Sequence, residues 1–472
     1  MDMPQISLAV DIGASSGKML LGWVEEGRLL TEEVWRFPNG AKKQGGRRCW
    51  DVDGLFDQIM RGLAHCAEIG KIPSSVGIDT WAVDFVLIGR DGRRLGDAVC
   101  YRDHRTDGMD KKLLEILSEE ELYARTGIQK QIFNTIYQLL AVKEQEPELL
   151  EQAEHLLLIP DYLHYRLTGQ ICTEYTNATT TALVNAHTRD WDWELIDRLG
   201  LPRRLFCKLV QPGERLGELL PDVARRAGYS CSVVLPATHD TGSAVLAVPA
   251  QEENFLFLSS GTWSLIGMER CEPDCSAQSR AANFTNEGGY GGTIRYLKNI
   301  MGLWMIQSIR AELGEEMTFA RLSELAEEAG PFPAEIDVDD PSFLAPESMK
   351  EAVQAYCRRT GQAVPQSPGE LASCVYAGLA ARYGQAVREI FALTGVSCPR
   401  LYIVGGGSRD ALLNRLTAQA TGKEVFTGPS EGTAVGNLLA QLLAQGVFSS
   451  VAEARGAVRR SFPVGCVRPR PQ

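Results

Sequence analysis

Apolar and polar positions in the first part of the chain follow two different periods, which together predict an α/β unit. Leu55, Ile59, Leu63 and Cys66 recur at helical spacing and predict a helix over Asp53–Cys66, with Asp51 or Asp53 as its N-cap. Short apolar runs bounded by glycine or charged residues predict strands. They cover Ile6–Asp11, Met19–Val24, Leu29–Phe37, Val76–Thr80 and Val83–Ile88. Strands that alternate with helices favour an α/β fold over an all-helical one.

The opening pattern returns in the second half of the chain. Phe255–Leu258 and Trp263–Met268 have the pattern of strands on either side of a Ser/Gly turn, as two strands flank Gly13–Gly17 near the N-terminus. This similarity predicts an internal duplication, with a boundary around Val248–Glu253. We therefore expect two domains, residues 1–248 and 249–472.

The remaining segments fit two such domains. Residues 106–204 have a mostly helical pattern, with charged faces that solvent would cover. Leu371–Phe391 carries an apolar stripe typical of a long amphipathic helix. A strand at Leu401–Val404 leads into three glycines, and Pro429–Thr433 opens what we predict to be the last helix, through about Leu443.

Composition and charge narrow the class of protein. The 472 residues include 48 Lys and Arg against 60 Asp and Glu, and the net charge of −12 argues against a general nucleic-acid binder. No apolar run approaches the roughly 20 residues of a membrane span, and no signal-peptide pattern precedes the first strand. We therefore expect a cytoplasmic protein. The twelve cysteines form no C-x-x-C pair, so reduced thiols are expected rather than a zinc site.

The first segment with candidate chemistry is the loop from Asp11 to Lys18. Glycines, Ser15, Ser16 and a lysine follow a strand that ends in a carboxylate, and exposed amides, hydroxyls and an ammonium suit a polyphosphate. Asp11 is a candidate Mg²⁺ ligand, because Mg²⁺ prefers carboxylate and phosphate oxygens. The spacing is not that of a Walker A loop, and an ordinary hairpin turn remains the alternative.

Two further glycine clusters strengthen the nucleotide interpretation. Ser259-Ser-Gly-Thr-Trp-Ser264 repeats the first hairpin, so two similar turns could grip one phosphate chain. Gly405–Gly407 ends a buried strand, where the absence of side chains would let a flat ring such as adenine approach the backbone. A tight connection between strand and helix is the alternative for this cluster.

Ala237-Thr-His-Asp-Thr-Gly242 opens an apolar helix and offers a candidate base. Asp240 could be only an N-cap. A carboxylate beside His239 and Thr241 is also suited to accept a proton from a substrate hydroxyl. Phosphoryl transfer needs positioning, charge neutralisation and a base on the nucleophile, and these segments provide that set.

These motifs occur in the order seen in the FGGY carbohydrate kinases, which the chain resembles over roughly residues 5–465. Within that family it is most similar to the branch that phosphorylates L-rhamnulose. The blocks that carry the resemblance are Asp11–Lys18, Gly77–Phe85, Thr238–Thr241, Ser259–Thr262 and Gly405–Gly407, with Trp50–Asp53, Tyr101–Arg105, Glu174–Thr181, Asn286–Gly289 and Leu297–Trp304.

The resemblance implies a fold and a reaction. It implies two ribonuclease-H-like domains of the actin-like ATPase type, with the catalytic cleft between them. The implied reaction is ATP- and Mg²⁺-dependent phosphorylation of L-rhamnulose at O1 in L-rhamnose catabolism. We expect a monomer or homodimer that, as its charge and its short apolar runs indicate, binds neither nucleic acid nor membrane. Asp240 would be the general base. Ala82, His239, Asp240, Thr241 and Asn299 would hold the ketose, and Ala14, Ser15, Ser16, Gly17, Lys18, Thr262, Gln307 and Gly406 would bind ATP.

Two departures from the family pattern and two alternatives stand beside this hypothesis. Ala82 replaces a frequent glycine, and its methyl group would crowd the sugar. Lys18 replaces a frequent arginine, which keeps the charge and loses the bidentate fork. The alternatives are a kinase for another ketose, such as L-fuculose or a xylulose-type sugar, and an actin- or chaperone-like ATPase without a sugar substrate.

Overall fold

The computed structural model describes residues 5–344 and 346–469, which form two compact units. The first unit contains the residues up to Ala247 together with Arg270–Tyr296 and Thr433–Ser461. The second contains Val248–Glu269, Leu297–Gly432 and the residues from Phe462 onward. Both units therefore combine segments far apart in sequence, whereas the sequence suggested one boundary after residue 248.

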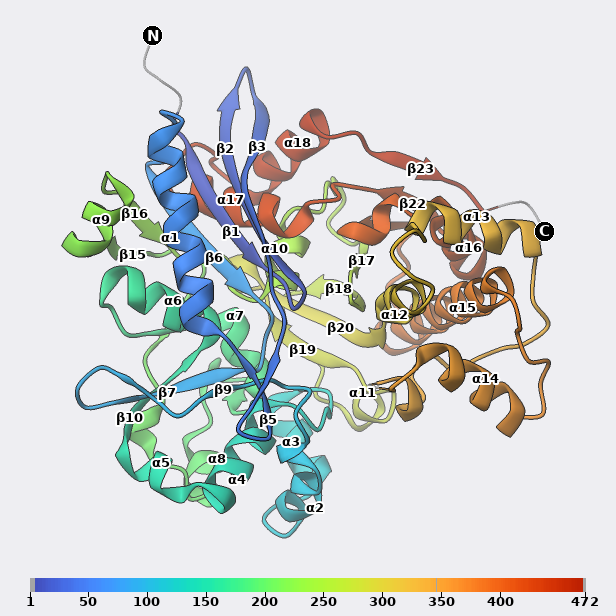
Figure 1. Ribbon diagram of the computed structural model, residues 1–472, viewed down its shortest axis with the longest axis horizontal. Helices are drawn as coiled ribbons and strands as arrows, with labels where there is room; N and C mark the ends of the chain where they lie inside the picture. The colour runs from blue at the N-terminus through green and yellow to red at the C-terminus, as the bar shows by residue number, and fades with distance from the viewer. Residues whose placement is uncertain (1–4, 345, 470–472) are drawn as a thin grey trace. The chain divides into compact units, whose positions relative to one another are not determined.

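The first unit consists of a mixed sheet, smaller ribbons and helices (Figure 1). Its strands are β1 (Ser7–Ile12), β2 (Ser16–Glu25), β3 (Arg28–Pro38), β4 (Lys42–Gln44), β5 (Arg47–Trp50), β6 (Ser75–Thr80), β7 (Phe85–Gly89), β8 (Arg94–Leu95), β9 (Ala98–Val99), β10 (Ala153–Leu158), β11 (Thr173–Glu174), β12 (Val184–Asn185), β13 (Asp190–Trp191), β14 (Leu209–Val210), β15 (Arg215–Glu218), β16 (Ser232–Val234) and β19 (Thr285–Gly288). Its helices are α1 (Val52–Glu68), α2 (Met109–Leu114), α3 (Glu119–Thr126), α4 (Thr135–Gln145), α5 (Pro147–Gln152), α6 (Ile159–Thr168), α7 (Tyr175–Ala178), α8 (Trp193–Arg198), α9 (Pro221–Ala227), α10 (Asp240–Leu246), α11 (Ala277–Ala281), α17 (Gly432–Ala444) and α18 (Val451–Ser461).

The main sheet of this unit has the order β15-β16-β6-β1-β2-β3. Successive side chains on a strand point to opposite faces, and β1 shows this clearly. Val10 packs in the cluster that contains Ile59 of α1, whereas Ala9 packs with Leu438 of α17. The sheet is therefore covered by α1 on one face and by α17 on the other, which explains why β1 and β6 are buried along their whole length.

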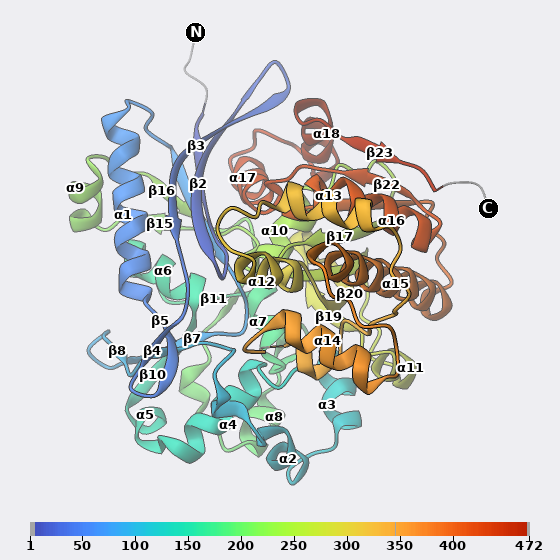
Figure 2. The ribbon, with the colours of Figure 1, turned by 45° about the vertical axis from the view of Figure 1, so that its right-hand side comes forward.

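Most of the second sheet, whose order is β19-β20-β18-β17-β21-β22-β23, belongs to the second unit, whereas β19 and residues 294–296 of β20 belong to the first. The strands are β17 (Leu256–Ser260), β18 (Trp263–Arg270), β20 (Ile294–Met301), β21 (Arg400–Val404), β22 (Glu424–Thr427) and β23 (Gly465–Val467). The helices are α12 (Trp304–Glu312), α13 (Phe319–Ala329), α14 (Met349–Arg359), α15 (Pro368–Thr394) and α16 (Ala411–Thr421). The long helix α15 packs beside α12, α13 and α16 (Figure 2).

The predicted duplication is visible in the strand pairing of the two units. In the first, β1 pairs antiparallel with β2 and parallel with β6. In the second, β17 pairs antiparallel with β18 and parallel with β21. The α/β fold and both strand–turn–strand hairpins are therefore confirmed. Among the described residues, no helix is both long and apolar enough to cross a membrane.

Most predicted elements are confirmed within a few residues, and Asp51 is the N-cap of α1, where its side chain accepts from the Gly54 amide. Two predictions are wrong. The helix that ends near Leu443 is not the last one, because α18 follows it. Val83 does not begin a strand, because its φ of 67° lies in the left-handed region and β7 starts at Phe85.

Candidate functional site

Three carboxylates of the first unit gather at one edge of its main sheet. Asp11 of β1 and Asp79 of β6 are directly opposite each other in the parallel register. The amide of Thr80 donates to the oxygen of Thr238 at 2.9 Å, so the segment that leads to Asp240 continues this edge. Their closeness has an electrostatic consequence. Burial, and then the carboxylates of Asp11 and Asp240, raise the pKa of Asp79 well above its usual range.

Asp79 is held from the opposite end of the chain. Its Oδ2 accepts a 2.6 Å hydrogen bond from Asn437 of α17, which also donates to the oxygen of Gly77. Among the described residues none donates to Asp79 Oδ1, although that atom is buried. Neither Asp79 nor Asn437 is among the site residues predicted from the sequence. Asp79 could have been found from the sequence, because it is an acidic residue inside the apolar strand Val76–Thr80.

The first hairpin brings Lys18 to this edge. Lys18 of β2 is opposite Asp11 in the antiparallel register, and its Nζ lies 3.2 Å from Asp11 Oδ2. Ala14 and Ser15 form the turn, while Ser16 and Gly17 already belong to β2. A Cβ atom on Gly17 would lie 2.2 Å from the ring of Phe37, so packing on that ring by itself requires a glycine there. The hairpin thus presents one cation beside the carboxylates.

A buried glutamate anchors the segment that contains the candidate base. Glu174 Oε2 accepts from the amide of Thr238 at 3.0 Å and from its hydroxyl at 2.8 Å. Its Oε1 accepts from the amide of Thr176 at 2.8 Å. Burial raises the pKa of Glu174, although the hydrogen bonds from the amides and hydroxyls of Thr176 and Thr238 lower it. Glu174 therefore fixes the chain two residues before Asp240, a role that its position in the sequence did not indicate.

Asp240 is the first residue of α10 and not its N-cap. His239 occupies the cap position, and Asp240 Oδ1 accepts from the amide of Thr241 at 2.6 Å and from its hydroxyl at 3.2 Å. None of the described residues donates to Oδ2. The Asp240 side chain is 32% exposed, whereas that of His239 is 9% exposed. The N-cap interpretation is therefore wrong, and the carboxylate keeps one accessible oxygen that can accept a proton.

A tight turn after β6 carries Ala82, which is partly exposed. Asp84 Oδ2 accepts from the indole nitrogens of Trp50 at 2.6 Å and Trp81 at 3.0 Å, and Oδ1 accepts from Gln138 at 3.0 Å. Burial raises the pKa of Asp84 to about 6, although the Trp50, Gln138 and Trp81 hydrogen bonds lower it.

The backbone of the same turn is held in an unfavourable conformation. Positive φ is unusual for a β-branched residue such as Val83. Its oxygen accepts from the hydroxyl of Thr135 at 2.7 Å and from Gln138 at 3.2 Å, which keeps the turn in place. Strained backbone often marks a functional site, and here it lies next to Ala82.

The second unit contains the other predicted nucleotide residues. Thr262 lies in the turn between β17 and β18, and its oxygen accepts from the amide of Trp304 at 3.2 Å. That contact places the turn at the start of α12, which carries Gln307. Gly406 follows β21.

The three glycines after β21 differ in what surrounds them. Cβ atoms on Gly405 and Gly407 would lie 2.9 and 2.0 Å from atoms of Ser260, whereas a Cβ on Gly406 would meet nothing within 4 Å. A tight connection between strand and helix therefore explains Gly405 and Gly407. It does not explain Gly406, which borders open space. Asn299, the fifth predicted sugar residue, is a partly exposed residue of β20 in this unit.

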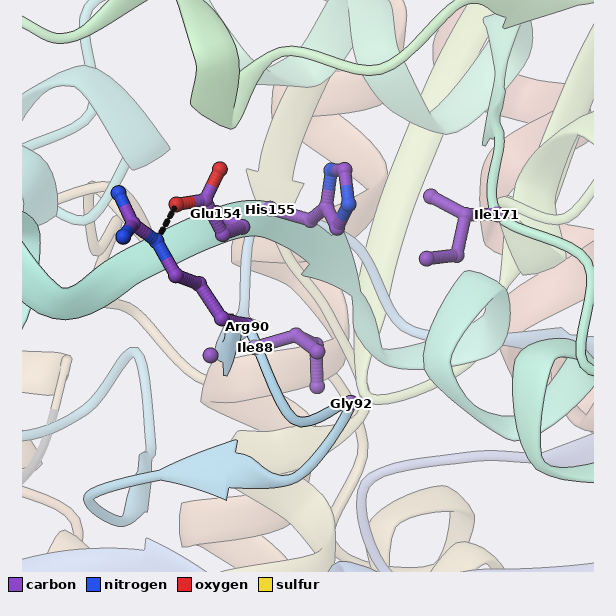
Figure 3. A pocket seen from close by; sticks show the side chains of 7 residues that line it. Ile88, Arg90, Gly92, Glu154, His155 and Ile171 are labelled. Carbon is purple, nitrogen blue, oxygen red and sulfur yellow. Dashed lines mark hydrogen bonds and ion pairs between the residues drawn. The ribbon is translucent and has the colours of Figure 1, made fainter.

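A separate hollow of about 500 Å³ lies beside the β7–β8 turn of the first unit (Figure 3). Its walls include Ile88, His155 and Ile171, and Arg90 Nε forms an ion pair of 2.7 Å with Glu154 Oε1 across it. Arg90 is largely exposed, and ion pairs of this kind contribute little. None of the predicted site residues lines this hollow.

Phosphoryl transfer needs charge neutralisation and a base on the nucleophile, and the lysine and the carboxylates at this sheet edge are groups of that kind. The models of the N- and C-terminal domains of the FGGY family of carbohydrate kinases match residues 6–247 and 256–445. The chain belongs to this family and is a carbohydrate kinase. Sugar kinases of this family use ATP as a substrate.

Individual relatives agree with the family assignment. The chain is 48% identical over 460 residues to a protein of Oceanobacillus iheyensis named rhamnulokinase, covering 98% of this chain and 97% of that one. It is 49% identical over 458 residues to a rhamnulokinase of Halalkalibacterium halodurans, covering 97% of each. The structure of a ligand-bound xylulose kinase from Lactobacillus acidophilus has the same fold, with a TM-score of 0.79, 17% identity and coverage of 99% and 94%.

Proposed function

We propose that this carbohydrate kinase transfers the γ-phosphoryl group of ATP to O1 of L-rhamnulose, giving L-rhamnulose 1-phosphate and ADP. Asp240 carries the proposal, because it is an acid with one oxygen held by Thr241 and the other accessible. Relatives that match nearly the whole chain and bear the name rhamnulokinase support the choice of sugar. The enzyme would act in the cytoplasm as a monomer or homodimer. Its reaction would be the step of L-rhamnose catabolism that consumes the ketose.

The sugar would be held by residues of both the Thr238–Thr241 segment and the turn after β6. His239, Asp240 and Thr241 would contact its hydroxyls, Ala82 would lie beside its ring, and Asn299 would add an amide. The proton of O1 would move to Asp240 as the new O–P bond forms. At the same time the bond between the γ-phosphorus and its bridging oxygen breaks, and the electron pair leaves with ADP.

ATP would be bound by residues of the three glycine-containing segments. These are Ala14, Ser15, Ser16, Gly17 and Lys18 in the first hairpin, Thr262 in the second, and Gln307 and Gly406. The Lys18 ammonium would neutralise phosphate charge, and the open space at Gly406 suits the approach of a flat ring.

The carboxylate edge suits a magnesium ion bound together with phosphates. No group of three or more His, Cys, Asp or Glu side chains among the described residues could enclose a metal by itself. Mg²⁺ commonly uses one or two protein carboxylates and completes its shell with phosphates and water. Asp11 is the residue that would hold it, and the bound ion would neutralise charge on the phosphates.

The test is a panel of sugars in an assay that couples ADP release to NADH oxidation, with the product identified by ³¹P NMR. We expect L-rhamnulose to give the highest kcat/KM and a sugar 1-phosphate. The alanine at position 82 makes a different ketose the second candidate, so L-fuculose and D-xylulose belong in the panel. A higher kcat/KM for either would replace L-rhamnulose as the substrate, and ADP release that no sugar stimulates would contradict the kinase assignment for this site.

A further inference from the structure

A buried arginine touches His239 from the side opposite to the candidate base. Arg295 lies in the part of β20 that belongs to the first unit, as His239 does. It is fully buried, and its Nε donates to the oxygen of Gly288 at 2.8 Å. Its Nη1 lies 3.2 Å from Oε2 of Glu287, and its Nη2 lies 3.1 Å from Nδ1 of His239. The proposed reaction uses neither Arg295 nor Glu287, so this buried ion pair calls for another role.

The chemistry of the guanidinium group determines which nitrogen of His239 carries a proton. Arginine has only donors, so an imidazole nitrogen that faces it at hydrogen-bond distance must be the acceptor. Nδ1 of His239 is then unprotonated, and a neutral ring carries its proton on Nε2. Nε2 lies 3.5 Å from Oδ1 of Asp240, so the protonated nitrogen is the one nearer to the carboxylate.

The surroundings of His239 also allow the other tautomer, in which Nδ1 carries the proton. Oε2 of Glu287 lies 3.3 Å from Nδ1 of His239 and would accept a proton from it if Arg295 were absent. The ring would then present the lone pair of Nε2, and not an N–H, toward Asp240. A negative carboxylate facing a lone pair is unfavourable, so the tautomer of His239 affects how Asp240 is oriented.

We propose that Arg295, held by Glu287 and Gly288, is a positioning residue that fixes His239 as its Nε2–H tautomer. The N–H is then on the ring nitrogen nearest to Oδ1 of Asp240, the oxygen that accepts from the two donors of Thr241, and Oδ2 would accept the proton of the sugar hydroxyl. The catalytic part of this inference rests on the proposed function of Asp240.

The tautomer can be read directly from long-range ¹H–¹⁵N spectra of the ¹⁵N-histidine-labelled protein, without sugar or ATP. The chain has six histidines, and the signal that disappears in His239→Gln belongs to position 239. We expect the wild type at neutral pH to show a protonated Nε2 and an unprotonated Nδ1. We expect Arg295→Met to move the proton to Nδ1, and Arg295→Lys to keep the wild-type pattern, because an ammonium is also a pure donor.

Kinetics then test the link to catalysis. In Arg295→Met we expect kcat to fall by about 10- to 100-fold, with KM for ATP unchanged and with partial recovery in Arg295→Lys. The proposal is overturned if His239 in the wild type carries its proton on Nδ1, or protons on both nitrogens. The wild-type spectrum alone decides this, even if Arg295→Met does not fold. A swapped tautomer with an unchanged kcat overturns the positioning role. Failure of L-rhamnulose as a substrate is a separate result, since the spectra contain no sugar.

Discussion

Gly436 of α17 lies directly against the backbone of Ser243 in α10, because a Cβ atom at position 436 would come within 1.7 Å of the Ser243 oxygen. This contact sets how close α17 can come to the helix that begins with Asp240. The next residue of α17, Asn437, reaches Asp79. One helix therefore supports both the candidate base and the buried acid beside it.

We expect Gly436→Ala to lower the free energy of unfolding by about 3 kcal/mol, because the new methyl group overlaps backbone that cannot rotate away. Urea unfolding followed by circular dichroism measures this change. Gly456→Ala in α18 is the matched control, since its Cβ would meet only the flexible end of Arg460 at 3.2 Å. Alanine has a higher helix propensity than glycine, so Gly456→Ala should leave the free energy of unfolding unchanged or raise it. A Gly436→Ala variant as stable as this control would contradict the close contact with Ser243.

The sequence located the hairpins and the candidate base for an identifiable reason. Alternating burial and glycine turns are local signals, so β1, β2, β17 and β18 could be located from a few residues each. Asp240 was likewise found from its own surroundings. The sequence left open whether Asp240 is an N-cap, since the choice between the last non-helical and the first helical residue depends on backbone angles.

The supporting residues could not be predicted in the same way. Asn437 is 358 positions from the Asp79 that it binds, and Glu174 is 64 positions from Thr238. Arg295 and His239 are 56 positions apart. Each of these contacts exists only after the strands and helices pack, and a single sequence carries no pattern that relates the partners.

Lys18 should contribute to ATP affinity through its charge. We expect Lys18→Met to raise the Kd for MgATP by about 10- to 100-fold, as the loss of a charge-assisted hydrogen bond would predict. Lys18→Arg should retain most of the affinity. Isothermal titration calorimetry measures both variants, with the exposed Lys43→Met as a control for loss of general charge. An unchanged Kd in Lys18→Met would contradict the assignment of the first hairpin to ATP.

His164 should make the protein sensitive to acid. Its Nε2 accepts from the amide of Ile78 at 3.0 Å, and burial lowers its pKa from 6.5 to about 3. Below pH 6.5 the unfolded chain binds a proton that the folded protein excludes, so stability falls as the pH falls. Relative to His164→Gln, the wild type should lose about 1.4 kcal/mol of unfolding free energy per pH unit between pH 6.5 and the lowest accessible pH.

Urea unfolding of the wild type and of His164→Gln at several pH values tests this difference. Gln keeps an acceptor for the Ile78 amide but does not titrate. The exposed His187→Gln should follow the wild-type pH dependence. Parallel curves for wild type and His164→Gln would show that His164 titrates normally.

Ala82 should tune the fit of the sugar. We expect Ala82→Gly to raise kcat/KM for L-rhamnulose several-fold, because removal of the methyl group relieves crowding beside the ring. Ala82→Val should lower it by about 10-fold or more, in line with the effect of added methyl groups in a substrate pocket. KM for ATP is the internal control and should stay constant. Equal kcat/KM in all three proteins would place the sugar away from this turn.

The central claim is that Asp240 accepts the proton of a sugar hydroxyl during phosphoryl transfer from ATP. The most direct measurement is L-rhamnulose-dependent ADP release by the wild type and by Asp240→Asn, with ATP binding determined on the same samples. An amide cannot act as the base, so we predict a loss in kcat of about 10²- to 10⁴-fold with an ATP affinity close to that of the wild type. Turnover by Asp240→Asn at a rate near that of the wild type would contradict the account.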